Sequence, residues 1–199
     1  MPGRAADASL AEIPAAPGAY VLLMHLAEPV RLAVGGLGER PFAAGYYLYA
    51  GSALGGLRAR LARHLRATKR LHWHIDYLLQ RAPVCEVWWL ASRERSECAW
   101  AGALAVAPGV QPFEAPFGAS DCRCVTHLFY SVERPQTIAP RGWPLSRVSV
   151  HAARGRVADC LGGGELGLQP GPQRRLHLRP QHGPAGLAAQ GGTQPLERQ

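Results

Sequence analysis

The residue usage changes abruptly after Thr137, and this change limits how much of the 199-residue chain can form a core. Before it, continuous apolar runs at residues 20–24 and 84–90 are typical of buried strands. Beyond it, residues 138–199 hold 11 of the 23 glycines and 7 of the 17 prolines, with no sustained period of 2 or 3.6. Such a segment cannot bury enough apolar surface to offset chain entropy. The sequence therefore predicts a flexible N-terminus at 1–14, a folded domain at 15–135 and a disordered tail at 136–199.

The formal net charge is +8, and the tail carries most of it. A basic excess favours a nucleic-acid partner, although charge concerns association rather than chemistry. Two interpretations of the tail stay open. It is either a basic segment that adds affinity for phosphates or the non-native product of a frame-shifted, GC-rich reading frame. The abruptness of the change favours the second.

The cysteines and the N-terminus indicate the compartment. Five cysteines fall short of the density of a disulfide framework, and the first residues lack the apolar core of a signal peptide. Residues 13–27 carry no Asp, Glu, Lys or Arg, but they contain two prolines and are shorter than the ~20 apolar residues that span a bilayer. We therefore expect a cytoplasmic protein with no membrane span.

The hydrophobic pattern switches between strand and helix periods along residues 15–135. Residues 19–26 and 30–34, separated by a Glu-Pro turn, read as a hairpin, and residues 46–50 read as an aromatic-rich strand that Gly51 ends. Further strands are expected at 84–91 and 126–132, and helices at 56–70, 73–80 and 93–106. The pattern predicts a compact α+β fold in which about three helices flank a small mixed or antiparallel sheet.

The first predicted helix is strongly basic. Leu57, Leu61 and Leu65 form one apolar stripe. The other faces carry six cations and no carboxylate, namely Arg58, Arg60, Arg63, Arg66, Lys69 and Arg70. The sequence leaves open whether this is a solvated face or a surface that contacts phosphates.

Cysteine and histidine gather near residue 125. Cys122, Cys124 and His127, with His72 and His74 upstream, offer ligands for zinc. However, the two cysteines are closer than in the usual Cys-x2-Cys knuckle, and no second cysteine pair completes a tetrahedral set. We therefore expect no stoichiometric zinc and assign these residues to packing or to the border of an active site.

Several ordered motifs resemble the GIY-YIG nuclease superfamily, and its Uri-type branch in particular. They begin with Gly18, Ala19 and Tyr20, then Tyr49, Ala50 and Gly51, and then Arg60 with His64 four residues later. The blocks at 44–53, 71–79, 96–98 and 118–124 follow the Uri-type pattern in the same order. The resemblance covers about the first two thirds of the chain and implies a compact GIY-YIG-like fold.

The resemblance also implies roles for individual residues. Glu97 would bind a divalent cation, Mg²⁺ or Mn²⁺, Arg60 would hold the scissile phosphate, and Tyr49 or Tyr20 would help to deprotonate the attacking water. His64 would point to the same site as Arg60, because residues four apart share a helix face. The residues expected to bind nucleic acid are Gly51, Ser52, Arg58, Arg63, Arg66 and Lys69. Secondary candidates for the site are His74, Asp121, Cys122, Cys124 and His127.

The expected function is that of a divalent-metal-dependent DNA endonuclease acting in repair or processing of DNA. Two alternatives stay open. One is a nucleic-acid-binding module without turnover, supported by Ala19 and Ala50 in place of the signature isoleucines and by Ser52 where many relatives have lysine. The other is a zinc-stabilised interaction domain, which the Cys/His cluster would have to justify.

Overall fold

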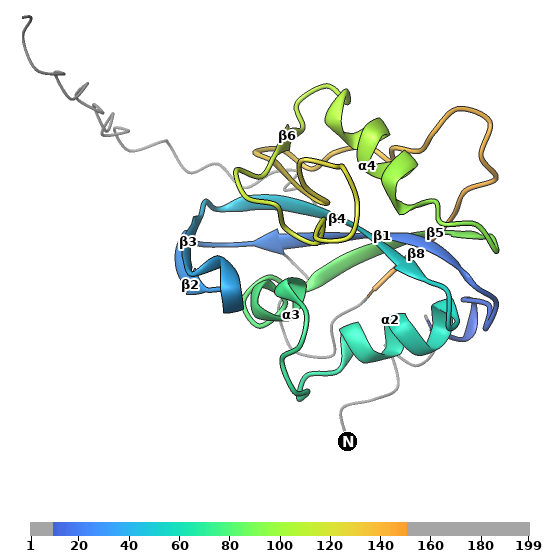
Figure 1. Ribbon diagram of the computed structural model, residues 1–199, viewed down its shortest axis with the longest axis horizontal. Helices are drawn as coiled ribbons and strands as arrows, with labels where there is room; N and C mark the ends of the chain where they lie inside the picture. The colour runs from blue at the N-terminus through green and yellow to red at the C-terminus, as the bar shows by residue number, and fades with distance from the viewer. Residues whose placement is uncertain (1–9, 151–199) are drawn as a thin grey trace, which may run out of the picture. The chain divides into compact units, whose positions relative to one another are not determined.

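The computed structural model describes residues 10–150, whose strands form two antiparallel sheets (Figure 1). The larger sheet has six strands in the order β6-β7-β4-β1-β5-β8, and β2 pairs with β3 separately. The strands are β1 Gly18–Leu26, β2 Val30–Ala33, β3 Glu39–Phe42, β4 Gly45–Ala53, β5 Val84–Ala91, β6 Gln111–Pro112, β7 Leu128–Ser131 and β8 Ser146–Ser149. The helices are the 3₁₀ helix η1 Gly35–Leu37 and the α-helices α2 Leu57–Leu65, α3 His74–Leu78 and α4 Glu97–Ala105. The predicted α+β fold with three helices is confirmed, and the sheet is antiparallel.

Strand β1 lies in the middle of the six-stranded sheet and is buried on both faces. Tyr20 and Leu22 belong to the core on the side of α2 and α3, whereas Val21 and Leu23 belong to the core under α4. Figure 1 shows this three-layer arrangement, with α2 and α3 on one side of the sheet and α4 on the other. The continuous apolar run predicted from the sequence thus reflects a central strand with helices on both faces.

Two expectations about strands are wrong. The segments at 19–26 and 30–34 do not form a hairpin, because β1 pairs with β4 and β5 while β2 pairs with β3. Gly51 does not end its strand either, since β4 continues to Ala53 in register with β1. Turn residues predict that the chain reverses, but not which strand it then joins.

The basic helix is shorter than predicted. Helix α2 ends at Leu65, and Arg66 takes extended backbone angles. Leu57 and Leu61 are fully buried, as the apolar stripe requires. The basic residues Arg66, Lys69 and Arg70 therefore lie in the connection from α2 to α3, where helical spacing no longer relates them to Arg60 or Arg63.

The folded region extends past both predicted boundaries. Residues 136–150, assigned to the tail from the sequence, include β8, which pairs with β5. Trp143 packs on the buried Trp100 with ring centroids 5.8 Å apart, and the Trp100 indole N–H donates to the Ile138 carbonyl at 3.0 Å. At the other end Ile13 is 1% exposed. A few apolar side chains hold these segments in place, although their sequence shows no strand or helix period. The predictions of a flexible N-terminus and a disordered tail otherwise concern residues 1–9 and 151–199, which lie outside the described residues.

Among residues 10–150, none of the helices has the length and apolar character needed to cross a bilayer.

The Trp143 contact predicts that the stable domain ends near residue 150 rather than 135. Trp143→Ala in the full chain should lower the free energy of unfolding by about 2 kcal/mol, because it removes a half-buried aromatic pair. Val132→Ala, at a side chain that is 73% exposed, is the matched control and should change stability by less than about 0.5 kcal/mol. Denaturant unfolding measures the free energy of unfolding of both variants. Equal effects of the two substitutions would show that residues 136–150 do not contribute to the stability of the domain.

Candidate active site

Two tyrosines on neighbouring strands face the same side of the sheet. Tyr20 of β1 lies opposite Gly51 of β4, and its ring centroid is 6.5 Å from that of Tyr49. A Cβ added at Gly51 would lie 2.5 Å from the Tyr20 hydroxyl, so no larger residue fits beneath this ring. The space over Gly51, a residue expected to bind nucleic acid, is therefore filled by the Tyr20 side chain, and Gly51 positions that ring.

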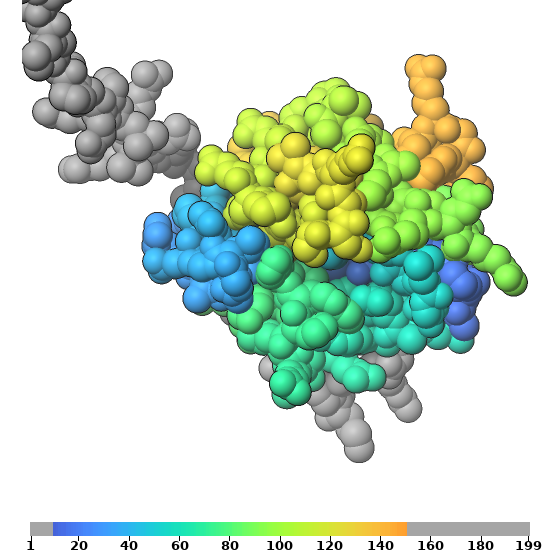
Figure 2. Space-filling model, in the orientation of Figure 1, coloured from blue at the N-terminus to red at the C-terminus, as the bar shows by residue number. Residues whose placement is uncertain are grey.

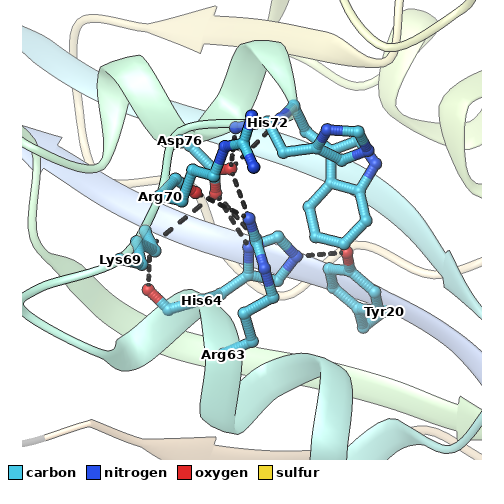
Figure 3. A network of polar contacts seen from close by, with 8 residues as sticks. Tyr20, Arg63, His64, Lys69, Arg70, His72 and Asp76 are labelled. Atoms are coloured by element: carbon cyan, nitrogen blue, oxygen red, sulfur yellow. Dashed lines mark hydrogen bonds and ion pairs between the residues drawn. The ribbon is translucent and has the colours of Figure 1, made fainter.

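His64 of α2 meets Tyr20 across the core. The Tyr20 hydroxyl lies 2.7 Å from His64 Nε2, and both residues are buried (Figure 3). Burial, assisted by the charge of Lys69, lowers the pKa of His64 to about 3, so the imidazole is neutral near pH 7. Burial likewise raises the pKa of Tyr20 well above its usual value. With the neutral tautomer protonated at Nδ1, Nε2 accepts the hydrogen bond from Tyr20.

Behind His64, the buried carboxylate of Asp76 organises the polar network in Figure 3. Both of its oxygens accept from the Arg63 guanidinium, at 3.0 and 2.8 Å. The backbone N–H groups of His72 and Trp73 donate to Oδ2 at 3.0 and 3.1 Å. Burial alone would raise the pKa of Asp76, but these hydrogen bonds outweigh it and lower the pKa to about 2. Asp76 therefore stays ionised and fixes the connection between α2 and α3.

Trp73 holds the guanidinium of Arg60 in place. The Cζ atoms of Arg60 and Arg63 lie 4.3 and 4.0 Å from the centroid of the Trp73 ring. Stacking of this kind orders a guanidinium while leaving its N–H groups free to donate. Burial raises the pKa of both Tyr20 and Tyr49. The positive charge of Arg60 opposes this effect at each tyrosine but does not overcome it.

Tyr49 connects the two sides of the candidate site. Burial raises its pKa to about 12, and the same phenol is influenced by Arg60 and Asp76 from one side and by Asp121 and Glu97 from the other. Phe117 packs edge-on against its ring, with centroids 6.3 Å apart. Gly118 has a φ of +70°, and a Cβ there would lie 2.8 Å from the Tyr49 ring. The loop before β7 therefore forms one wall of the Tyr49 site.

Glu97, the predicted metal ligand, begins helix α4 and is 6% exposed. Its Oε1 lies 3.2 Å from Arg95 Nε, while its buried Oε2 has no hydrogen-bond partner among the described residues. A buried carboxylate oxygen without a donor is costly unless something else satisfies it. Hard oxygen donors are the ligands that Mg²⁺ and Mn²⁺ prefer, and Mg²⁺ is commonly held by one or two carboxylates plus substrate phosphate. The chemistry of Glu97 thus fits the predicted cation.

Arg95 bridges two acidic side chains of this region. Besides Glu97, it pairs with Asp121 through Nη2 at 2.6 Å. The bridge joins the N-terminus of α4 to the loop before β7. It places the secondary candidate Asp121 beside the Glu97 site, on the exposed surface.

The Cys/His residues form a cluster next to Glu97. Ligand atoms of Cys98, Cys122, Cys124 and His127 all lie within 4.8 Å of one another. His127 Nε2 is 3.8 Å from Cys98 Sγ and 3.4 Å from Cys122 Sγ. The upstream histidines are not members: His74 instead packs against Phe117, with ring centroids 5.6 Å apart.

Of the other residues predicted to bind nucleic acid, some lie near the candidate site and others point away from it. Arg63 is engaged with Asp76, and Lys69 donates to the His64 carbonyl and lies 3.8 Å from Asp76 Oδ1. Arg58 Nε donates to the Ile13 carbonyl at 2.8 Å, toward the N-terminal segment. Ser52 alternates with Gly51 along β4 and so faces the opposite side of the sheet from Tyr20.

Sequence reasoning gave no role to three residues that shape the site: Asp76, Trp73 and Cys98. Asp76 and Trp73 stand in the block at 71–79, where their spacing of three residues at a helix start is the signal of a capping carboxylate. Cys98 has no local signal, because its partners lie at least 24 residues further along the chain.

A family model, described as domain of unknown function DUF123, matches residues 19–141. The chain belongs to the DUF123 family. The match begins in β1, contains every residue of the candidate site from Tyr20 to His127, and ends before β8. Comparison of this DUF123 protein with curated proteins and with solved structures found no match.

The neutral, buried His64 predicts a particular dependence of stability on pH. Its pKa is about 3 in the folded protein against the ordinary 6.5, so below pH 6.5 the unfolded chain takes up a proton that the folded chain does not. Stability should therefore fall on acidification, by up to about 2 kcal/mol between pH 7 and pH 5 from this group. His64→Gln should remove about 1–2 kcal/mol of that loss, measured by urea unfolding at both pH values.

The exposed His72 supplies the control for this measurement. His72→Gln replaces an exposed histidine outside the buried pair of Tyr20 and His64, and should leave the pH dependence as in the wild type. If His64→Gln kept the pH dependence of the wild type, protonation of His64 would not be the cause of the loss of stability at low pH.

Proposed function

We propose that this domain is a divalent-metal-dependent DNA endonuclease of the GIY-YIG type, acting in repair or processing of DNA. The observation that carries the proposal is the convergence at Tyr49: Tyr20, Arg60 and Glu97 come from β1, α2 and α4, and each contacts this phenol or acts on its pKa. These are the residue types that phosphodiester hydrolysis needs, namely a proton acceptor, a cation for the phosphate and a carboxylate.

Arg60 would stabilise negative charge on the phosphate. Its guanidinium is stacked on Trp73 and close enough to the tyrosines to affect both pKa values. A donor that is held in place before the reaction needs little reorganisation when charge develops.

The tyrosines would act as hydrogen-bonding groups at the attacking water. Burial keeps both phenols protonated at neutral pH in the free protein, so neither is a ready base. Tyr20 donates to His64, which leaves its hydroxyl oxygen as an acceptor for a proton on water or on a neighbouring phenol. Proton removal would therefore depend on the positive charge of Arg60 and of the divalent cation that Glu97 would hold.

Glu97 would hold the cation through its buried Oε2, which has no hydrogen-bond partner within residues 10–150. When bound there, a divalent cation would offset charge on the phosphate and lower the pKa of nearby acids. Arg95 already pairs with the other oxygen and would keep the carboxylate oriented.

The DNA backbone would follow the basic hollow beside α2. This hollow is lined by Arg63, Arg66, Thr68, Lys69, Arg70 and His72. Asp76 offsets part of the charge of Arg63 and Lys69, whereas Arg66 and Arg70 are exposed. The exposed pair is therefore better suited to contact phosphates than the two residues bound to Asp76.

A nucleic-acid-binding module without turnover is the second candidate. The raised pKa of both tyrosines favours it, as do Ala19, Ala50 and Ser52 at positions where the resemblance departs from the family pattern. The two candidates differ in whether metal-dependent cleavage accompanies binding.

Substitution at Glu97 and Arg60 should separate binding from turnover. Glu97→Gln should abolish cleavage of a panel of DNA structures in Mg²⁺ or Mn²⁺ and leave DNA affinity equal or higher, because it removes a negative charge beside the phosphate. Arg60→Ala should lower the rate by on the order of 10²-fold or more, the usual cost of losing one transition-state donor. Tyr49→Phe should also reduce cleavage while the domain stays folded.

Glu94→Gln, three residues before Glu97 and exposed, is the matched control and should cleave like the wild type. If the wild type cleaves no DNA structure with either metal but binds DNA, the binding module replaces the nuclease. Cleavage by Glu97→Gln at the wild-type rate would remove Glu97 from the mechanism.

The salt dependence of DNA binding should identify the residues that meet the DNA backbone. Replacing Arg66 and Arg70 with Ala should reduce the slope of log affinity against log salt by about 0.9 for each phosphate that is no longer neutralised. Arg40→Ala with Arg81→Ala removes the same charge from other exposed positions and should leave the slope close to that of the wild type. Equal slopes for the two double variants would place the DNA surface elsewhere.

A further inference from the structure

Three sequence segments bring four soft metal ligands to one point. Cys98 comes from the first turn of α4, Cys122 and Cys124 from the loop before β7, and His127 from the residue preceding β7. The three cysteines are free thiols, and His127 is buried. Strand β7 pairs with β4, and the His127 carbonyl accepts from the Ala50 N–H, so the histidine backbone is fixed to the sheet.

The spacing of these atoms matches a tetrahedral zinc site. With Zn–S of about 2.3 Å and Zn–N of about 2.0–2.1 Å, tetrahedral angles place sulfur and nitrogen ligands about 3.6 Å apart and two sulfurs about 3.8 Å apart. His127 Nε2 lies 3.4 Å from Cys122 Sγ and 3.8 Å from Cys98 Sγ, on either side of that value. The whole set falls within 4.8 Å, so a cation at its centre requires only small side-chain movements.

We propose that Cys98, Cys122, Cys124 and His127 form a structural zinc site of the Cys₃His type. Three thiolates and one imidazole are soft to borderline ligands that select Zn²⁺ over Mg²⁺ or Mn²⁺. Four protein ligands close the coordination sphere, which is the arrangement of structural sites, whereas catalytic sites keep one position open. The sequence did not predict zinc because it offers no second cysteine pair near residue 125, whereas Cys98 supplies the fourth ligand from a distant helix.

The zinc would join α4 to the loop that forms the Tyr49 wall. Cys98 directly follows Glu97, and the loop before Cys122 carries Phe117 and Gly118, which contact the Tyr49 ring. In Figure 2 the yellow atoms of this loop lie beside the green atoms of α3, in agreement with the packing of Phe117 on His74. The loop has little regular structure of its own, so a metal cross-link would fix it where hydrogen bonds between strands do not.

Elemental analysis of the full chain, purified without chelator, tests the site directly. We expect about one zinc per chain, and less than about a tenth of that in Cys122→Ser and in His127→Asn. His72→Asn is the matched control and should retain zinc, because His72 lies outside the cluster. As a second measurement, wild-type protein stripped of metal and titrated with Co²⁺ should show the visible absorption of a tetrahedral thiolate site, and chelation should lower its melting temperature.

The outcomes are decided without reference to DNA cleavage. Stoichiometric zinc that is lost with Cys122 or His127 and kept with His72→Asn supports the site, even if the protein cleaves no DNA. Wild-type protein that holds no zinc and gives no tetrahedral Co²⁺ spectrum overturns it. Iron in place of zinc, or zinc that persists in both ligand variants, also overturns it. The Co²⁺ titration uses wild-type protein alone and therefore remains decisive if the variants fail to fold.

Discussion

The buried carboxylate of Asp76 is the interaction on which the candidate site depends. It receives both Arg63 contacts and two backbone N–H groups, and so fixes the end of α2 relative to the start of α3 (Figure 3). An ionised carboxylate is stable in the interior only when its oxygens are satisfied in this way. Because α2 also carries Arg60 and His64, this buried charge, together with the burial of Leu57 and Leu61, holds the helix where His64 meets Tyr20.

The sheet supplies the second constraint, which is room for two large rings. Tyr20 lies above Gly51, and Tyr49 lies against Gly118, at positions where a Cβ would collide with each ring. Cross-strand neighbours in an antiparallel sheet are only about 5 Å apart, so a large ring on one strand favours a small residue opposite. These glycines leave room for the two phenols, whereas the contact with nucleic acid expected of Gly51 would require open space that the Tyr20 ring fills.

The residues of the candidate site were expected from the resemblance, and local spacing accounts for part of their grouping. Arg60 and His64 share a helix face through their spacing, and Tyr49 and Gly51 belong to one strand, so their proximity needed no knowledge of the fold. Cys98 and Asp76 could not be assigned roles in the same way. Each acts on residues brought to it by tertiary contacts, and Cys98 meets its thiol and imidazole neighbours only because α4 begins beside the loop before β7.

The sequence by itself determined the α+β class, a buried strand near residue 20 and the three helices, because hydrophobic period and turn residues act over a few neighbouring positions. Tertiary structure decided which strands pair, where the domain ends and which basic residues remain available. Pairing of β1 with β4 and β5 depends on contacts between residues far apart in the chain. The packing of Trp143 on Trp100 also joins residues far apart in the chain. The ion pair with Asp76 offsets the charge of Arg63 and makes it less available to a ligand. Local pattern cannot encode these choices, since the energy of each depends on a partner whose position only the folded chain defines.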